Sequence, residues 1–296
     1  VIIRAMSLCI KKAFNITRDN IVVAQPIVIF MIVISLTTGA LYQQTNKIAY
    51  MVFFVANILL CTAFFSGWFN MIQKTLEHNK KAEKNFYRDD REKAEASFAL
   101  GKEFFPGVGE YFLPVTFTLV AYVVVYMLLL VAAYKFGMKY LPHPHINWGE
   151  FMAAANSTPA QMQKYVASLS FYQLKAINIW MFFFGAVFCV FSLLTMFLFP
   201  ALYNNLSKRD DKKTPYLKSL VLAPFSAFNT NIVFVFKHFL GSVSLLIFLL
   251  FLNIIMSFLS FLFSLNIVLT IIGLLVSFYV MTYALVLIFL YYDENK

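Results

Sequence analysis

The residues with the greatest potential for chemistry form a small group of metal-ligand types beside two prolines. His143 and His145 are two residues apart, and Glu150 follows shortly after them. In an extended segment, residues two apart point to the same side, and imidazole together with carboxylate is a ligand set that binds zinc. No fourth ligand stands at a recognisable spacing, and Tyr140 and Trp148 in the same stretch are typical of a loop at the level of lipid headgroups. The pattern therefore leaves two interpretations open, a metal site and a loop anchored at the membrane surface.

The chain contains none of the common catalytic motifs. HExxH, GxSxG and the phosphate-binding GxxxxGK[ST] are all missing, so a hydrolase would lack its acid, base and metal. The three cysteines, Cys9, Cys61 and Cys189, lie in apolar surroundings without a CxxC spacing, which is typical of buried, inert thiols. We therefore expect no catalytic residue, no cofactor and no enzyme activity.

The composition excludes a water-soluble domain. Hydrophobic residues make up 61% of the 296 residues, and charged residues only 13%, whereas soluble domains have about 45–50% and about 25%. The mean hydropathy is +0.74. A single soluble core of this size cannot bury so much apolar surface, so the sequence indicates an integral membrane protein.

Six apolar runs are long enough to cross the hydrocarbon core as helices. They contain no acidic or basic residue, and their continuous apolar character does not fit the alternating strands of a membrane barrel. The lack of ionisable residues also argues against an ion-coupled transporter, because such a protein binds its coupling ion at mid-membrane. The first run is too long for the apolar part of a signal peptide. The predicted spans are residues 21–41, 48–72, 112–134, 177–203, 239–263 and 267–290.

The distribution of Lys and Arg predicts the orientation. Nineteen of these residues lie before the first span, between spans two and three, between spans four and five, or at the C-terminus, and five lie on the other side. Because cytoplasmic loops are enriched in Lys and Arg, both termini are predicted to be cytoplasmic. The segment at 135–175 is then the longest outside loop.

Three stretches next to spans are predicted to be amphipathic surface helices, approximately residues 2–20, 94–111 and 216–238. Each combines apolar positions on one face with basic residues elsewhere, and each leads into a helical hairpin. The chain thus resembles three repeats of a surface helix plus a hairpin within one polytopic domain, 1–296. Such helices lie in the headgroup plane, or they brace the ends of neighbouring spans. The basic residues predicted to contact lipid headgroups or a partner are Arg4, Lys11, Lys12, Arg18, Lys102, Lys218 and Lys237.

In its plan the chain resembles the membrane domain attached to some bacterial glycerophosphodiester phosphodiesterases, together with related six-span inner-membrane proteins of unassigned function. The matching elements are the segments that lead into spans one and five, Ile10 to Asn20 and Ser219 to Phe239, and the terminal Tyr291-Tyr292-Asp293. The catalytic barrel of those enzymes is missing from this chain. The resemblance therefore implies a non-catalytic membrane module, and it carries over no site residue.

These observations favour a non-enzymatic protein of the bacterial inner membrane that assembles with, or regulates, envelope or lipid-handling machinery. Its expected partners are membrane lipids and another protein of a membrane complex, and not nucleic acid. The alternative is a permease for a hydrophobic or lipid-like solute that works without ion coupling, since a charge-free bundle rich in Phe offers a path for such a molecule.

Overall fold

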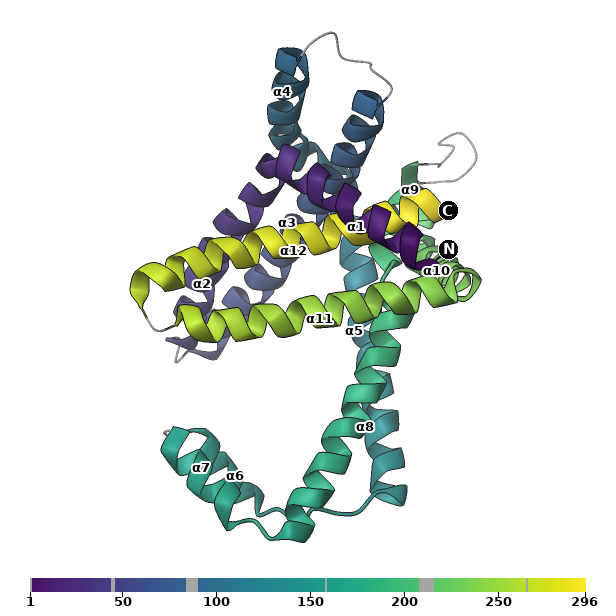
Figure 1. The fold of residues 1–296 in the computed structure, drawn as a ribbon. Helices are drawn as coiled ribbons and strands as arrows, with labels where there is room; N and C mark the ends of the chain where they lie inside the picture. The colour runs from purple at the N-terminus through teal and green to yellow at the C-terminus, as the bar shows by residue number, and fades with distance from the viewer. Residues whose placement is uncertain (1, 44–45, 84–89, 158, 208–215, 265) are drawn as a thin grey trace. The chain divides into compact units, whose positions relative to one another are not determined.

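The structure is a computed structural model that describes residues 2–43, 46–83, 90–157, 159–207, 216–264 and 266–296. Within these residues all regular elements are helices (Figure 1). Continuous helices satisfy their backbone N–H and C=O groups internally, which is what a segment in hydrocarbon requires. The predicted all-α class is therefore confirmed.

Six helical segments are long and apolar enough to cross a membrane, so the chain is a multi-pass membrane protein. Several segments extend beyond the predicted spans, because a helix continues past the apolar run into polar sequence. The segments are Ile21–Tyr42, Lys47–Glu83, Ala94–Tyr140, Phe171–Ser207, Phe239–Phe263 and Ile267–Asn295.

The described helices follow one another with short connections. The elements, in chain order, are α1 (Ile2–Asp19), η1 (Ile21–Ala24), α2 (Gln25–Tyr42), α3 (Lys47–Glu83), α4 (Asp90–Ala99), η2 (Leu100–Glu103), α5 (Phe104–Tyr140), α6 (Trp148–Ala155), α7 (Pro159–Ser168), α8 (Phe171–Thr195), α9 (Leu198–Ser207), α10 (Tyr216–Lys237), α11 (Phe239–Phe263) and α12 (Ile267–Asn295).

The fourth predicted span, 177–203, is not one helix, and this corrects the sequence-based prediction. α8 ends at Thr195 and α9 begins at Leu198. The physical reason is Pro200, which has no N–H to donate to the Met196 carbonyl one turn earlier. The side chain of Asn231, which is fully buried, repairs the break. It accepts from the Phe197 N–H (3.0 Å) and donates to the Leu194 carbonyl.

Two of the three predicted surface helices are formed as single helices, α1 and α10, at nearly the predicted bounds. The third, 94–111, is divided between α4, the 3₁₀ turn η2 and the start of α5. Pro106 explains the division, because it cannot donate to the carbonyl of Lys102. Pro26 stands just after η1 in a similar place, and the two 3₁₀ turns contact each other. The repeat itself stays a prediction.

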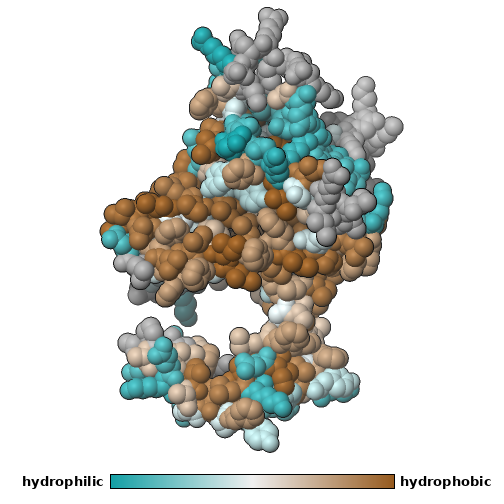
Figure 2. Space-filling view, viewed as in Figure 1, coloured by the Kyte–Doolittle hydropathy of each residue, from teal (hydrophilic) through white to brown (hydrophobic). Residues whose placement is uncertain are grey.

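The described contacts divide the chain into two compact units. Unit 1 comprises residues 1–121 and 193–296, and unit 2 comprises residues 122–192, so α5 and α8 each contribute to both. The prediction of a single domain stays a prediction. In unit 1, α2 packs on α3, α9 on α10, and α12 on both α1 and α11 (Figure 1). Hydrophobic residues cover the face formed by α11 and α12, and hydrophilic residues gather around α4 (Figure 2).

The core of unit 1 is centred on α3. Trp68 is fully buried, and its indole N–H donates to the Val23 carbonyl at 2.8 Å. Tyr203 of α9 donates its hydroxyl hydrogen to the Ser66 carbonyl at 2.7 Å. A Cβ on Gly67 would lie 2.8 Å from the carbonyl oxygen of Phe104, so this glycine lets the start of α5 approach α3 closely.

Unit 2 is held mainly by aromatic contacts. Trp180 of α8 packs against Gly137 of α5, where an added Cβ would lie 2.5 Å from the indole ring. The indole N–H donates to the carbonyl of Pro142 at 2.9 Å. The side chain of Asn147 caps α6 by accepting from the N–H groups of Gly149 and Glu150.

Candidate functional site

A network of ion pairs joins α1 and α3 to the end of α12. The Lys12 amine lies 2.7 Å from a carboxylate oxygen of Glu294 and 3.2 Å from one of Glu83. Burial alone would lower the pKa of Lys12, but the hydrogen bonds and charges of Glu294 and Glu83 outweigh burial and raise it. Lys12 therefore stays charged and braces two helices, the second of the two roles expected for a surface helix.

Asp293 extends the same network toward α9. Its carboxylate pairs with Lys80 of α3 and with Lys296, which lies 2.7 Å away. The Lys296 amine also donates to the side-chain oxygen of Asn204 at 3.0 Å. These groups, with Gln73, line a polar pocket of about 220 Å³. Because every cation named here has a protein acceptor, the network ties the ends of the helices together and leaves little charge for an outside ligand.

Asparagines near the predicted cytoplasmic ends bridge helices. Asn70 of α3 donates to the Glu103 carbonyl of η2 at 2.9 Å. Asn205 of α9 donates to the hydroxyls of Ser226 and Thr230 on α10, at 3.0 and 3.1 Å. These bonds position the segments that lead into the spans.

The predicted basic contact residues fall into three groups. Lys12 lies in the ion-pair network, and Arg18 pairs with its neighbour Asp19 at 3.0 Å. Lys11, Lys102 and Lys237 are exposed, and they have no carboxylate partner among the residues that the structure describes. The side chains of Arg4 and Lys218 lie outside the described part. The structure thus does not gather the five described residues into one site.

The metal candidates lie in unit 2. The ring centroids of His143 and His145 are 6.2 Å apart. The Glu150 carboxylate accepts from the side-chain amide of Asn147 at 2.9 Å, so it takes part in capping α6. Across the described residues, no group of three or more His, Cys, Asp or Glu side chains is arranged to hold a metal.

Cys9 lies on the buried face of α1, with 4% of its surface exposed. Burial, with a smaller effect from the charge of Glu294, raises the pKa of this thiol to about 12. Since the thiolate is the reactive form, Cys9 is an inert core residue at neutral pH.

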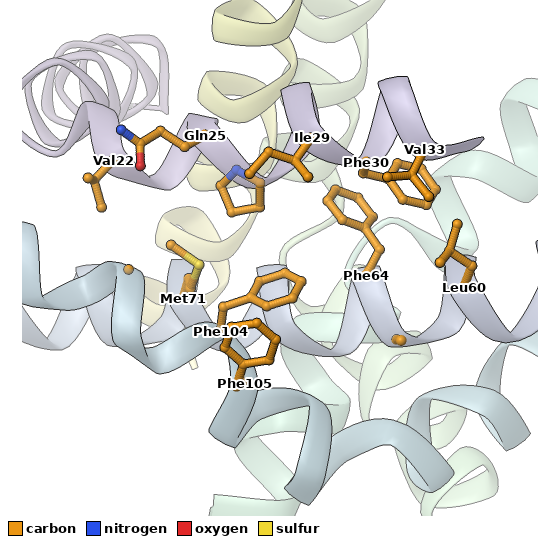
Figure 3. A pocket seen from close by; sticks show the side chains of 13 residues that line it. Val22, Gln25, Ile29, Phe30, Val33, Leu60, Phe64, Met71, Phe104 and Phe105 are labelled. Atoms are coloured by element: carbon orange, nitrogen blue, oxygen red, sulfur yellow. The ribbon is translucent and has the colours of Figure 1, made fainter. Parts of the chain in front are cut away.

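An apolar cavity of about 340 Å³ lies between α2, α3 and the start of α5. Figure 3 shows side chains of α2, including Ile29 and Phe30, facing Phe64 of α3 and Phe104 of α5. The rings of Phe30 and Phe64 stack with centroids 4.0 Å apart. Among the described residues of the lining, Gln25 has the only polar side chain. This volume is within the range of about 300–1,000 Å³ found for ligand pockets.

Sequence reasoning missed this cavity and the role of Asn231. The signals available were Pro26 and Pro106, whose positions predict the irregular turns beside the cavity, and Pro200, which predicts the break that Asn231 bridges. In comparisons with protein-family models, with curated proteins and with solved structures, no match to this chain was found. The resemblance to the phosphodiesterase membrane domain therefore stays a prediction.

Proposed function

We propose that this protein is a non-catalytic component of the bacterial inner membrane that assembles with, or regulates, envelope or lipid-handling machinery. The observation that carries this proposal is the contrast among its basic residues. Lys12, Lys80 and Lys296 are occupied by protein carboxylates. The exposed Lys11, Lys102 and Lys237 lack such partners among the described residues, so their charges are available to anionic headgroups or to an acidic surface of another protein.

Two observations support cytoplasmic termini. The excess of Lys and Arg before span one, between spans two and three and between spans four and five follows the positive-inside rule. The contact of Lys12 with Glu294 supports placing the two ends of the chain on the same side. A fluorescent protein that folds only in the cytoplasm, fused after Lys296, should fluoresce. A dark fusion in membranes that contain the full chain would contradict this orientation.

The proposal is tested by neutralising the three lysines together, as K11Q/K102Q/K237Q. The matched control is K135Q/K139Q/K164Q, which removes three exposed lysines of unit 2. Each protein is crosslinked in intact membranes, extracted in a mild detergent and studied by native mass spectrometry. We expect wild type and control to retain anionic lipid and a stoichiometric protein partner, and the first variant to lose both. Equal recovery from all three proteins would overturn the proposal.

The apolar cavity favours the second candidate, a permease for a hydrophobic or lipid-like solute. It offers such a molecule a place between α2, α3 and α5 without any ion-binding group. Vesicles that contain the purified protein should then move a fluorescent phospholipid between leaflets faster than vesicles without protein. An unchanged rate would remove the permease and leave the leading proposal standing.

A further inference from the structure

The cavity between α2, α3 and the start of α5 has the dimensions of a site for one lipid tail. We propose that it binds one acyl chain of a glycerophospholipid from the leaflet next to α1 and η2, with the lipid phosphate beside Lys102. This inference rests on the proposed role in lipid handling and names the ligand class. The cavity holds about 340 Å³, and its described lining has a single polar side chain, so it suits a long apolar group with one polar end.

The depth of the cavity corresponds to one leaflet. On α2 its lining extends from Gln25 to Val33, a rise of about 12 Å at 1.5 Å per residue. On α3 the lining extends from Leu60 to Met71, a rise of about 16 Å. Half of a hydrocarbon core of about 30 Å is about 15 Å. An acyl chain that enters at the level of the first residues of α2 would therefore fill the cavity to its far end.

The cavity opens on the outer face of unit 1. Ile29 and Phe105, both in its lining, keep 64% and 79% of their surface exposed. Exposed apolar side chains of membrane-spanning segments contact lipid tails, so this opening leads sideways into the hydrocarbon phase. A lipid tail can enter the cavity from there directly out of the membrane. A water-soluble solute has no such direct route, because it reaches the protein from water.

The polar end of the cavity lies at the two 3₁₀ turns. Gln25 lies at the same end as Val22, away from Val33 and Leu60 (Figure 3). Gly101 lines this end, and the next residue is the exposed Lys102. Ser97 fixes the geometry by donating to the side-chain oxygen of Asn20 at 2.8 Å, which ties α4 to the start of η1. Among the described residues, Arg18 and Lys102 are the cations that lie next to these turns in the chain. Arg18 pairs with Asp19, whereas Lys102 has no carboxylate partner there and can meet a phosphate.

The test compares two equal substitutions on one helix. A63F places a ring in the cavity, whereas A56F places the same ring on an exposed position of α3 outside the lining. The full chain is reconstituted with phosphatidylglycerol that carries a diazirine at mid-chain, irradiated and digested. We expect labels within 25–33 or 60–71 in wild type and in A56F, and about tenfold less labelling in A63F, because a filled cavity excludes the chain.

The polar end is tested with K102Q against K135Q, using the same lipid. K102Q should lower retention of the lipid in native mass spectra by at least about threefold, since it removes a charged contact with the phosphate. K135Q should leave retention unchanged. Thermal unfolding of each variant in detergent shows whether the protein is folded. A loss of labelling in a folded A63F is then evidence that the cavity binds the acyl chain.

The outcomes separate this inference from the proposed function. Equal labelling of the cavity peptides in wild type and A63F would overturn the acyl-chain site. So would a crosslinked dimer with no labelled lipid, which would assign the cavity to a second copy. In either case the lysine-dependent recovery of a partner could still be observed. Equal recovery of the partner from wild type and from K11Q/K102Q/K237Q, with labelling intact, would instead overturn the proposed function and leave the lipid site.

Discussion

The two units of this chain are stabilised in different ways. In unit 1, buried polar groups join helices that are distant in sequence, as Asn231 and Tyr203 do, and ion pairs add to these bonds at the end of α12. In unit 2, the described side chains are mostly exposed, and aromatic contacts join α5 to α8, with Trp180 against Gly137 and Phe191 near Tyr122 and Tyr126. Unit 1 therefore specifies its own packing, whereas many described apolar side chains of unit 2 stay exposed.

The largest expected difference between the units comes from exchanging one asparagine for leucine in each. N231L removes the partner of the buried Phe197 N–H and of the part-buried Leu194 carbonyl, and the unpaired N–H alone should cost about 1–3 kcal/mol. N178L changes an exposed residue of α8 in unit 2, and its cost should stay within about 0.5 kcal/mol. The measurement is the midpoint of thermal unfolding in a mild detergent, and equal shifts would refute the contrast.

Alanine at two glycines should give the next largest difference. G67A brings a Cβ within 2.8 Å of the backbone oxygen of Phe104. Because this oxygen cannot move without separating α3 from α5, we expect the free energy of unfolding to fall by about 1–3 kcal/mol. G137A meets only the far edge of the Trp180 ring, at 2.5 Å. Because the ring can rotate away, the decrease in the free energy of unfolding should be smaller. A G137A protein that unfolds at a lower temperature than G67A would contradict the expected difference between the two units.

The ion pairs should produce a smaller effect that depends on salt. E294Q removes one partner of Lys12, and because both side chains are about one-third exposed, the cost should be about 0.2–1 kcal/mol. The raised pKa of Lys12 means that its contribution is complete below its ordinary value of 10.5 and is lost as the pH rises through the higher folded value. The difference between wild type and E294Q should therefore be constant from pH 7 to 9, and it should shrink in high salt.

The smallest perturbation is a chemical probe of Cys9. In a variant that lacks the other two cysteines, an apolar maleimide should modify Cys9 slowly in the folded protein and quickly after unfolding in detergent. The pKa of about 12, against 9.0 for a free thiol, lowers the thiolate fraction by about a thousandfold. The matched variant that keeps only Cys189, a half-buried residue of unit 2, should show a smaller ratio. A fast reaction of folded Cys9 would show that α1 leaves its place on α12.

The sequence was a good guide to the spans and a poor guide to what joins them. Each span is a property of about twenty adjacent residues, so hydropathy locates it. The structure has six helical segments that are long and apolar enough to span, and the fourth is interrupted between α8 and α9. The break at Met196–Phe197 was missed, although Pro200 carried a local signal for it. The residue that repairs the break, Asn231, had no signal of its own, because its partners lie on the far side of a connection.

The basic residues show the same division. Lys12 was predicted to contact lipid or a partner because a sequence shows its charge and not its neighbours. Its acceptor Glu294 is 282 residues away along the chain, and only the packing of α1 on α12 brings the two together. Lys102 lies in a turn that Pro106 helps to form, but the cavity beside it exists only where three helices meet.

By itself, therefore, the sequence determined the class of protein, the number of spans and the regions of charge, because these follow from transferring local groups between water and lipid. The tertiary structure decided which charges are already occupied, which helix break is repaired and where a cavity remains. Those properties depend on distances between helices that are remote in the chain, and close packing sets such distances through the shapes of side chains from several helices at once.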